Sequence, residues 1–300
     1  MLNKLYPQPD IIAALLASKK SPKTRKEYSR DFQEFTQFLG YDPHSFLQLS
    51  QLEATTAVLT YRQFLYDKGL KVNTVNRKIA AIKSLVNFAV QMGISTLTLA
   101  GIKADQVITY RDTTGIPSTE YKKILALPNR DTFSGLRDYA ILRLLWDLAL
   151  RRSEIEQINL GDVNLRDRSL LIVSKGRQDQ QKLTLPRKSV EAIRNYLELR
   201  GYSPLTQPLF IRLSYKDRGE RLTSKAIYRM VRSYAEKAGI EKVMSPHRVR
   251  HSSITHALDK GMSIRDTQKF SRHKDANTLF IYDDNRLDSQ GNVAEIVSDI

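Results

Sequence analysis

The chain has 300 residues, of which 41% are hydrophobic, and its 48 Lys and Arg outnumber its 32 Asp and Glu to give a formal net charge of +16. This length suits two ordinary domains with apolar cores, and the excess of positive charge is typical of proteins that bind a polyanion such as nucleic acid. The absence of cysteine excludes disulfides, thiolate zinc sites and a cysteine nucleophile, and no apolar run approaches the ~20 residues of a membrane span, so we expect a cytoplasmic protein.

Helical patterns dominate the first third of the chain, where the sequence predicts four helices before residue 94. Ser21 and Pro22 provide an N-cap and a first helical residue, and aromatic residues then recur at helical spacing until Gly40. Further helices are predicted near 50–68 and 73–91. We interpret the aromatic stripe as the core of a small helical bundle rather than as a surface that stacks on DNA bases.

A change in composition separates two predicted domains. Residues 94–117 are rich in Gly, Ser and Thr and lose the helical spacing, which is typical of a linker. We predict an N-terminal domain at residues 1–105, a linker that reaches about residue 117, and a C-terminal domain at residues 118–300.

The C-terminal domain combines helices with a small β element. Strand-like runs at 170–173 and 182–185 flank a turn whose Gly176 suits a hairpin. The predicted helices, with caps at Ser118 and Ser245, are 119–127, 134–150, 187–200, 223–238, 246–260, 263–270 and a short amphipathic stretch at 292–299. The predicted fold class is mostly α with a small β-sheet.

The last third of the chain contains residue types that could cleave a phosphodiester without water as the nucleophile. Such cleavage needs an attacking group, positive charge on the non-bridging oxygens and a proton donor for the departing oxygen. His247 and Arg250 share one face near the start of a predicted helix, where backbone N–H groups also favour an anion. His273 and Tyr282 follow, and the phenol of the tyrosine is a candidate nucleophile.

Two upstream cations add to this set. Arg151 follows an apolar helix and offers a guanidinium fork that suits a phosphate, and Lys175 lies at the tip of the predicted hairpin. Taken alone, each is also an ordinary surface residue. A zinc cluster of His247, His251, His256 and His273 is an alternative, but no nearby carboxylate completes a ligand set.

The chain resembles the tyrosine recombinases of the phage integrase type in the order and spacing of six residues, Arg151, Lys175, His247, Arg250, His273 and Tyr282. Its size and two-part layout resemble the Xer-like members, and the likeness spans nearly the whole chain. The resemblance implies an N-terminal helical core-binding domain and a C-terminal catalytic domain that form a clamp around DNA.

The resemblance also implies a role for each residue. Tyr282 attacks the scissile phosphate, forms a 3′-phosphotyrosyl bond and releases a 5′-hydroxyl. His247 is the general acid or base that assists the tyrosine, and Lys175 protonates the leaving oxygen.

The remaining residues bind the phosphate or support the site. In the family, the counterparts of Arg151 and Arg250 clamp the non-bridging oxygens, and His273 donates a hydrogen bond to the phosphate. Glu154 matches the acidic position that supports the site. No metal, ATP or other cofactor is expected.

Two short segments depart from the family pattern. Ser271 and Arg272 stand where the family has Leu-Gly before the second histidine, and Ala149 stands where it commonly has glycine before Leu150. Arg272 therefore places a bulky cation where the family favours glycine.

The partners that the resemblance implies are double-stranded DNA recombination sites, bound by a homotetramer with a dimer on each site and recombined through a Holliday junction. In the family a C-terminal helix docks on a neighbouring protomer, and Val293, Ile296 and Val297 are our candidates for that contact. Two other functions stay open, a type IB topoisomerase that relaxes supercoils and a non-catalytic DNA-binding protein. The second would be expected to have lost at least one catalytic residue.

Overall fold

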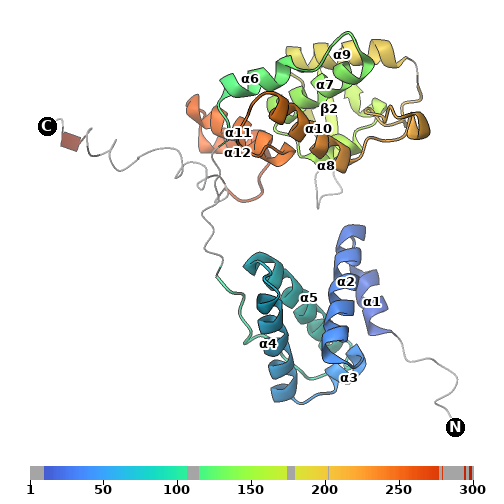
Figure 1. Cartoon of the computed structure of the whole chain (residues 1–300), viewed down its shortest axis with the longest axis vertical. Helices are drawn as coiled ribbons and strands as arrows, with labels where there is room; N and C mark the ends of the chain where they lie inside the picture. Colours follow the sequence, from blue (N-terminus) through green and yellow to red (C-terminus); the bar gives the residue numbers. More distant parts are fainter. Residues whose placement is uncertain are drawn as a thin grey trace. The chain divides into compact units, whose positions relative to one another are not determined.

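The computed structural model describes residues 10–106, 115–173, 180–201, 203–276, 279, 294 and 297–298. The chain divides into two compact units, unit 1 at Met1–Tyr110 and unit 2 at Arg111–Ile300 (Figure 1). Helices predominate in the described ranges, and unit 2 adds a three-stranded sheet, so the predicted class of a mostly α protein with a small sheet is confirmed. None of the described helices is long and apolar enough to cross a membrane.

Unit 1 is a helical bundle with one more helix than the sequence predicts. Its helices are α1 (Ile11–Ser18), α2 (Pro22–Leu39), α3 (Pro43–Leu47), α4 (Gln51–Asp67) and α5 (Val72–Gln91). Ser21 accepts the Thr24 N–H at the start of α2, and Gly40 ends that helix with a φ of 76°, as predicted. The extra helix α3 has only five residues and is capped by Asp42, so it is too short to show a periodic pattern in the sequence.

The aromatic residues of α2 form the core of unit 1, which confirms their interpretation. Phe32 and Phe35 are 2% and 3% exposed. Phe35 lies edge-on to Phe46 of α3, with ring centroids 5.1 Å apart, and 5.0 Å from the ring of Tyr61 in α4. This arrangement buries the stripe between helices.

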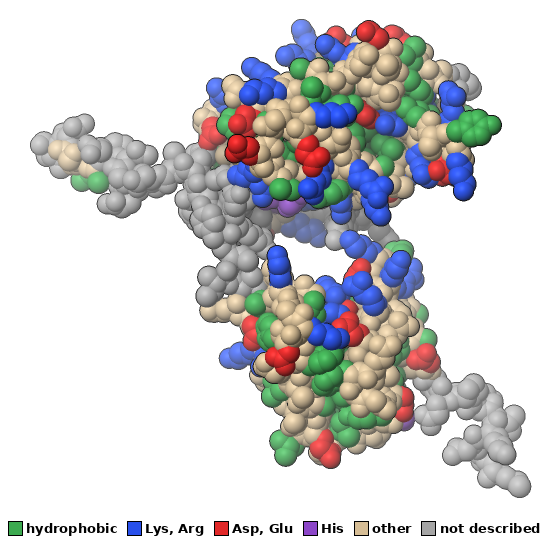
Figure 2. Space-filling view, viewed as in Figure 1, with side chains coloured by type: hydrophobic (Ala, Val, Ile, Leu, Met, Phe, Trp, Pro, Cys, Tyr) green, Lys and Arg blue, Asp and Glu red, His purple; other side chains and the backbone are tan. Residues whose placement is uncertain are grey.

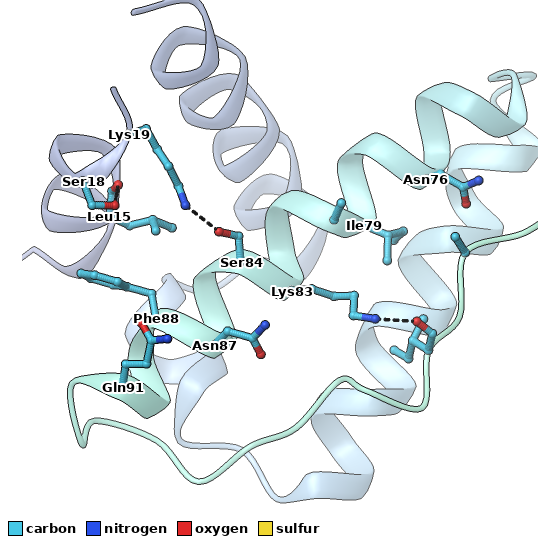
Figure 3. A pocket seen from close by; sticks show the side chains of 13 residues that line it. Leu15, Ser18, Lys19, Asn76, Ile79, Lys83, Ser84, Asn87, Phe88 and Gln91 are labelled. Carbon is cyan, nitrogen blue, oxygen red and sulfur yellow. Dashed lines mark hydrogen bonds between the residues drawn. The ribbon is translucent and has the colours of Figure 1, made fainter. Parts of the chain in front are cut away.

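A pocket of about 600 Å³ lies against α1 and α5 in unit 1 (Figure 3). Lys19, at the end of α1, donates a hydrogen bond to the Ser84 hydroxyl of α5 at 3.0 Å. Lys83 of α5 donates to the Ile102 carbonyl oxygen at 2.8 Å. These two lysines therefore tie α1 and the segment after α5 to α5 itself.

Unit 2 contains the sheet and the second set of helices. Its elements are α6 (Ser118–Ala126), α7 (Phe133–Asp147), α8 (Arg152–Gln157), β1 (Val163–Asn164), β2 (Ser169–Val173), β3 (Gln180–Thr184), α9 (Arg187–Arg200), α10 (Ser224–Lys237), α11 (Pro246–Asp259) and α12 (Ile264–Ser271), with short 3-10 turns at Leu160–Asp162 and Tyr215–Asp217. The strands pair antiparallel in the order β1-β2-β3, and Leu170 lies opposite Leu183.

The predicted cap of α6 and the predicted end of α7 are wrong. Ser118 is the first residue of α6, and Pro117 occupies the N-cap position without a side-chain bond. The apolar helix predicted to run to residue 150 ends at Asp147, because the backbone turns sharply at Ala149, whose φ is 45°. Apolar residues continue past the end of α7, and periodicity alone does not show such a turn.

A small apolar cluster joins this turn to α11 and α12. Ala149, Ile254 of α11, Leu258 of α11 and Leu279 are buried against one another. The cluster fixes the turn between α7 and α8 next to α11 and α12. Helix α11 carries His247 and Arg250, and His273 follows the end of α12. It therefore positions the candidate site.

Candidate active site

Arg250 is buried at the centre of the candidate site. Ser245 caps α11 by accepting the Arg248 N–H, and Pro246 is the first helical residue, as predicted. Arg250 lies in the second turn of that helix and is 1% exposed. Its Nη1 donates to the Ala149 carbonyl oxygen and its Nη2 to the Ser271 carbonyl oxygen. A buried cation needs such partners, and here they fix the plane of the guanidinium.

His273 lies beside this guanidinium. Its Nε2 is 3.4 Å from Arg250 Nη2, and its Nδ1 is 3.0 Å from the Ser271 hydroxyl. Burial, followed by the charges of Arg250 and Arg151, lowers the pKa of His273 to about 4, so the ring is neutral at pH 7. Since Nη2 can only donate, Nε2 is the acceptor in this contact and Nδ1 carries the proton.

His247 and His251 form a pair on α11. The two Nε2 atoms are 2.8 Å apart, with His247 exposed and His251 half-buried. Burial, the neighbouring His247 and the charge of Arg250 lower the pKa of His251 to about 3, so His251 is neutral at pH 7. The hydrogen bond between Nε2 of His247 and Nε2 of His251 orients the ring of His247.

The zinc alternative has no geometric support in the described ranges. No three His, Cys, Asp or Glu side chains there lie where they could share a metal ion. His256 lies instead beside Trp146, with ring centroids 5.7 Å apart.

Glu154 holds Arg151 at the start of α8. The carboxylate accepts the backbone N–H of Arg151 at 2.9 Å and its Nη1 at 2.7 Å. Glu154 is 2% exposed, whereas the side chain of Arg151 is 30% exposed. The carboxylate therefore anchors a guanidinium that still reaches solvent.

A third arginine also contacts this carboxylate. Arg272 Nη2 lies 3.1 Å from Glu154 Oε2. Burial opposes ionisation of Glu154, but the charge of Arg272 and the bonds from Arg151 outweigh it, so the pKa of Glu154 is below its ordinary value. Glu154 is therefore an ionised carboxylate between two guanidinium groups.

The surface of unit 2 has the charge expected near such a site. In Figure 2, an exposed histidine side chain of this unit is visible with Lys and Arg side chains beside it. The buried cluster contains more guanidinium groups than carboxylates and therefore suits a phosphate anion.

Comparison with known proteins identifies the family. Residues 115–288 match the phage integrase family, and residues 12–93 match the N-terminal SAM-like domain of phage integrases. The chain belongs to the phage integrase family. A tyrosine recombinase of Synechocystis sp. is 44% identical to it over 298 residues, which cover 97% of this chain and 95% of that protein. A tyrosine recombinase of Synechococcus elongatus is 43% identical, with 95% and 92% covered.

Solved structures agree with the fold of this recombinase. A lambda integrase dimer bound to a COC′ core site superposes with a TM-score of 0.67 at 17% identity, over 92% of this chain and 93% of that one. XerH bound to a palindromic difH substrate superposes with a TM-score of 0.64 at 20% identity, over 84% and 73%. The family match and the curated relatives confirm the predictions of a phage integrase-type tyrosine recombinase and of its function in site-specific recombination, and neither alternative function is favoured.

The structure of the recombinase brings together only some of the predicted site residues. Arg151, Glu154, Arg250 and His273 lie around the turn at Ala149, and His247 is close enough to lower the pKa of His273. Lys175 and Tyr282 lie outside the described residues, as do Val293 and Ile296. The roles of all these residues stay predictions.

Sequence analysis missed Arg272 as a member of the site. In the sequence this residue is conspicuous only as a bulky replacement for glycine beside His273. The structure supplies the missing signal, since the buried carboxylate of Glu154 needs balancing charge and Arg151 is also expected to face the substrate. Arg272 provides the second cation for this carboxylate.

Proposed function

We propose that this tyrosine recombinase cleaves double-stranded DNA at specific sites with the phenol of Tyr282. The phenolic oxygen forms a bond to phosphorus at the 3′ end, and the bond between phosphorus and the 5′ oxygen breaks. His247 takes the phenolic proton, and Lys175 gives a proton to the leaving 5′ oxygen. Rejoining reverses these steps with a 5′-hydroxyl from another strand, so the reaction consumes neither water nor ATP.

The convergence of Arg250, His273 and Arg151 on one turn is the observation that supports this proposal most. Cationic groups fixed in place before the substrate binds stabilise the charge that develops on the phosphate oxygens in the transition state. A bound phosphate also adds negative charge beside His273, which raises the pKa of this histidine and favours a ring that donates to the phosphate. Two carbonyl oxygens already fix the plane of the Arg250 guanidinium in the free protein.

One described residue close to Tyr282 in the sequence, Leu279, lies at the same turn. Leu279 is fully buried in the cluster that contains Ala149. Tyr282 is the third residue after Leu279, and a chain advances at most about 10 Å over three residues. This anchoring supports Tyr282 as the nucleophile.

The proposal is tested by mapping the covalent product. The probe is a nicked suicide duplex carrying the sequence that the wild-type protein enriches from random duplex DNA; the nick lets the cleaved fragment leave and so traps the intermediate. Trypsin should release the DNA joined to residues 275–286, in which Tyr282 is the sole tyrosine. DNA attached to any other peptide, or no adduct on a duplex that is demonstrably bound, contradicts the assignment.

Exchange of strands between two duplexes distinguishes the recombinase from a topoisomerase-like reaction. We propose that a dimer binds each site, that both units contact the duplex as a clamp, and that a homotetramer joins two sites in a Holliday junction. Duplexes of different length that carry the enriched site should give recombinant products. Relaxation of a supercoiled plasmid without such products would favour the topoisomerase-like reaction.

The C-terminal tail is our candidate for the contact between protomers. Val297 is 59% exposed on its own chain, which leaves its apolar surface for a neighbour. We expect deletion of residues 290–300 to impair assembly on paired sites and coordinated cleavage more than binding to a single site. Gel-shift measurements on one and two sites separate these effects, and an equal loss of both would contradict docking in trans.

A further inference from the structure

Arg272 adopts a backbone conformation that usually belongs to glycine. It follows α12 with a φ of 59° and a ψ of 34°, in the left-handed region. A residue with a Cβ adopts this region at a steric cost, whereas glycine does not. Interactions of the side chain must therefore offset the steric cost of this backbone conformation.

The side chain of Arg272 provides these interactions. It is 7% exposed. Nη1 donates to the carbonyl oxygens of Leu148 at 2.9 Å and Phe270 at 3.0 Å, and Nη2 donates to the Ala149 carbonyl oxygen and to Glu154 Oε2, both at 3.1 Å. The guanidinium thus fastens the end of α12 to the turn between α7 and α8.

The acceptors of Arg272 are shared with the two predicted phosphate-binding arginines. The Ala149 carbonyl oxygen also accepts Nη1 of Arg250, and Glu154 also accepts the backbone and side chain of Arg151. A shift of Arg272 would therefore move the partners of both residues. Arg272 therefore lies between Arg151 and Arg250 and contacts an acceptor of each.

The charge of Arg272 has a second effect on Arg151. A buried ion pair between Arg151 and Glu154 alone has no net charge, and its attraction for a phosphate is correspondingly weak. With Arg272 the cluster has two guanidinium charges against one carboxylate. Arg151 can then be anchored by Glu154 and still present a net positive charge to an anion.

We propose that Arg272 is a positioning residue of the recombinase, which aligns Arg151 with Arg250 and compensates the charge of Glu154. This inference rests on the phosphate-binding roles proposed above for Arg151 and Arg250. Arg272 itself does not contact the substrate. In this chain a buried guanidinium thus replaces the glycine that the family favours.

The test is single-turnover cleavage of the suicide duplex at saturating protein, with DNA affinity measured separately. We expect Arg272→Met and Arg272→Gly to lower the cleavage rate about 10- to 100-fold, because a small misplacement of a phosphate-binding group has effects of this size. Affinity should change much less than the rate. Arg272→Lys keeps the charge and should recover part of the rate lost in Arg272→Met.

A matched control separates the effect of losing the Arg272 side chain from the effect of placing glycine at a positive φ. Arg168 also has a positive φ, of 48°, but lies exposed between β1 and β2. Arg168→Gly makes the same change outside the site and should cleave at the wild-type rate. Wild-type cleavage by Arg272→Gly, in an assay where the wild type forms its adduct, overturns the role of Arg272 alone. Failure of the wild type to form an adduct instead overturns the proposed function.

A double variant tests the compensation of charge. In Arg272→Met the carboxylate of Glu154 faces Arg151 alone and neutralises it. Adding Glu154→Gln removes this negative charge while keeping an oxygen acceptor, so the double variant should cleave faster than Arg272→Met. A double variant that is slower than Arg272→Met, although folded by its Trp146 fluorescence, contradicts charge compensation.

Discussion

Tyr282→Phe is expected to abolish the covalent protein–DNA product on the suicide duplex while leaving DNA binding intact. The substitution removes only the phenolic oxygen, which is the atom that forms the bond to phosphorus. In the proposed reaction the phosphoryl group is transferred to this oxygen and not to water. We therefore expect the rate of cleavage to fall at least ~10³-fold. The measurement is the fraction of labelled DNA that resists separation from the protein in detergent, followed over time.

Two comparisons show whether the loss belongs to the nucleophile. Tyr215 lies fully exposed on unit 2, so Tyr215→Phe makes the same chemical change outside the site and should leave cleavage unchanged. His247→Gln should slow cleavage by about 10²- to 10⁴-fold, because it removes a general base and leaves the nucleophile. A covalent product with Tyr282→Phe would identify a different nucleophile.

The sequence predicted the helices of this protein better than the turns that shape its site. The cap at Ser245 and the proline at 246 correctly placed His247 and Arg250 on one helix. Helix ends within apolar stretches were harder to predict, because Leu148 and Leu150 continue the apolar pattern after α7 has ended at Asp147. That turn exposes the Ala149 carbonyl oxygen to Arg250, which no residue pattern indicates.

The order of charged residues in the sequence predicted candidate site residues but not how their charges are balanced. Arg151 and Arg250 were candidates from their types and positions, Glu154 was named by the family resemblance, and the structure brings these three residues around one turn. The contact of Arg272 with Glu154 joins residues 118 positions apart in the sequence. Such a pairing depends on tertiary packing and on a left-handed backbone, neither of which local sequence specifies.

Glu154→Ala is expected to destabilise unit 2 by about 3–5 kcal/mol, the usual effect of removing one partner from a buried ion pair. The side chains of Glu154 and Arg272 are 1% and 7% exposed, so alanine leaves the charge of Arg272 buried with carbonyl oxygens as its only partners among these contacts. Glu154→Gln keeps a hydrogen-bond acceptor for Arg272 and should lower the free energy of unfolding by less than Glu154→Ala does. Trp146 is the single tryptophan of the chain and lies in α7, so its fluorescence during urea unfolding reports on unit 2 alone.

An exposed ion pair of the same unit provides the control for this prediction. Arg232 and Glu236 lie on α10 with side chains 47% and 64% exposed, and exposed pairs contribute about 0–1 kcal/mol. Glu236→Ala should therefore unfold close to the wild-type urea concentration, whereas Glu154→Ala should unfold well below it. Equal effects would mean that solvent screens Glu154 as it screens Glu236. A large effect of Glu154→Ala that shrinks when Arg272→Met is added would locate the lost stability in the buried pair, because the second change removes the uncompensated charge.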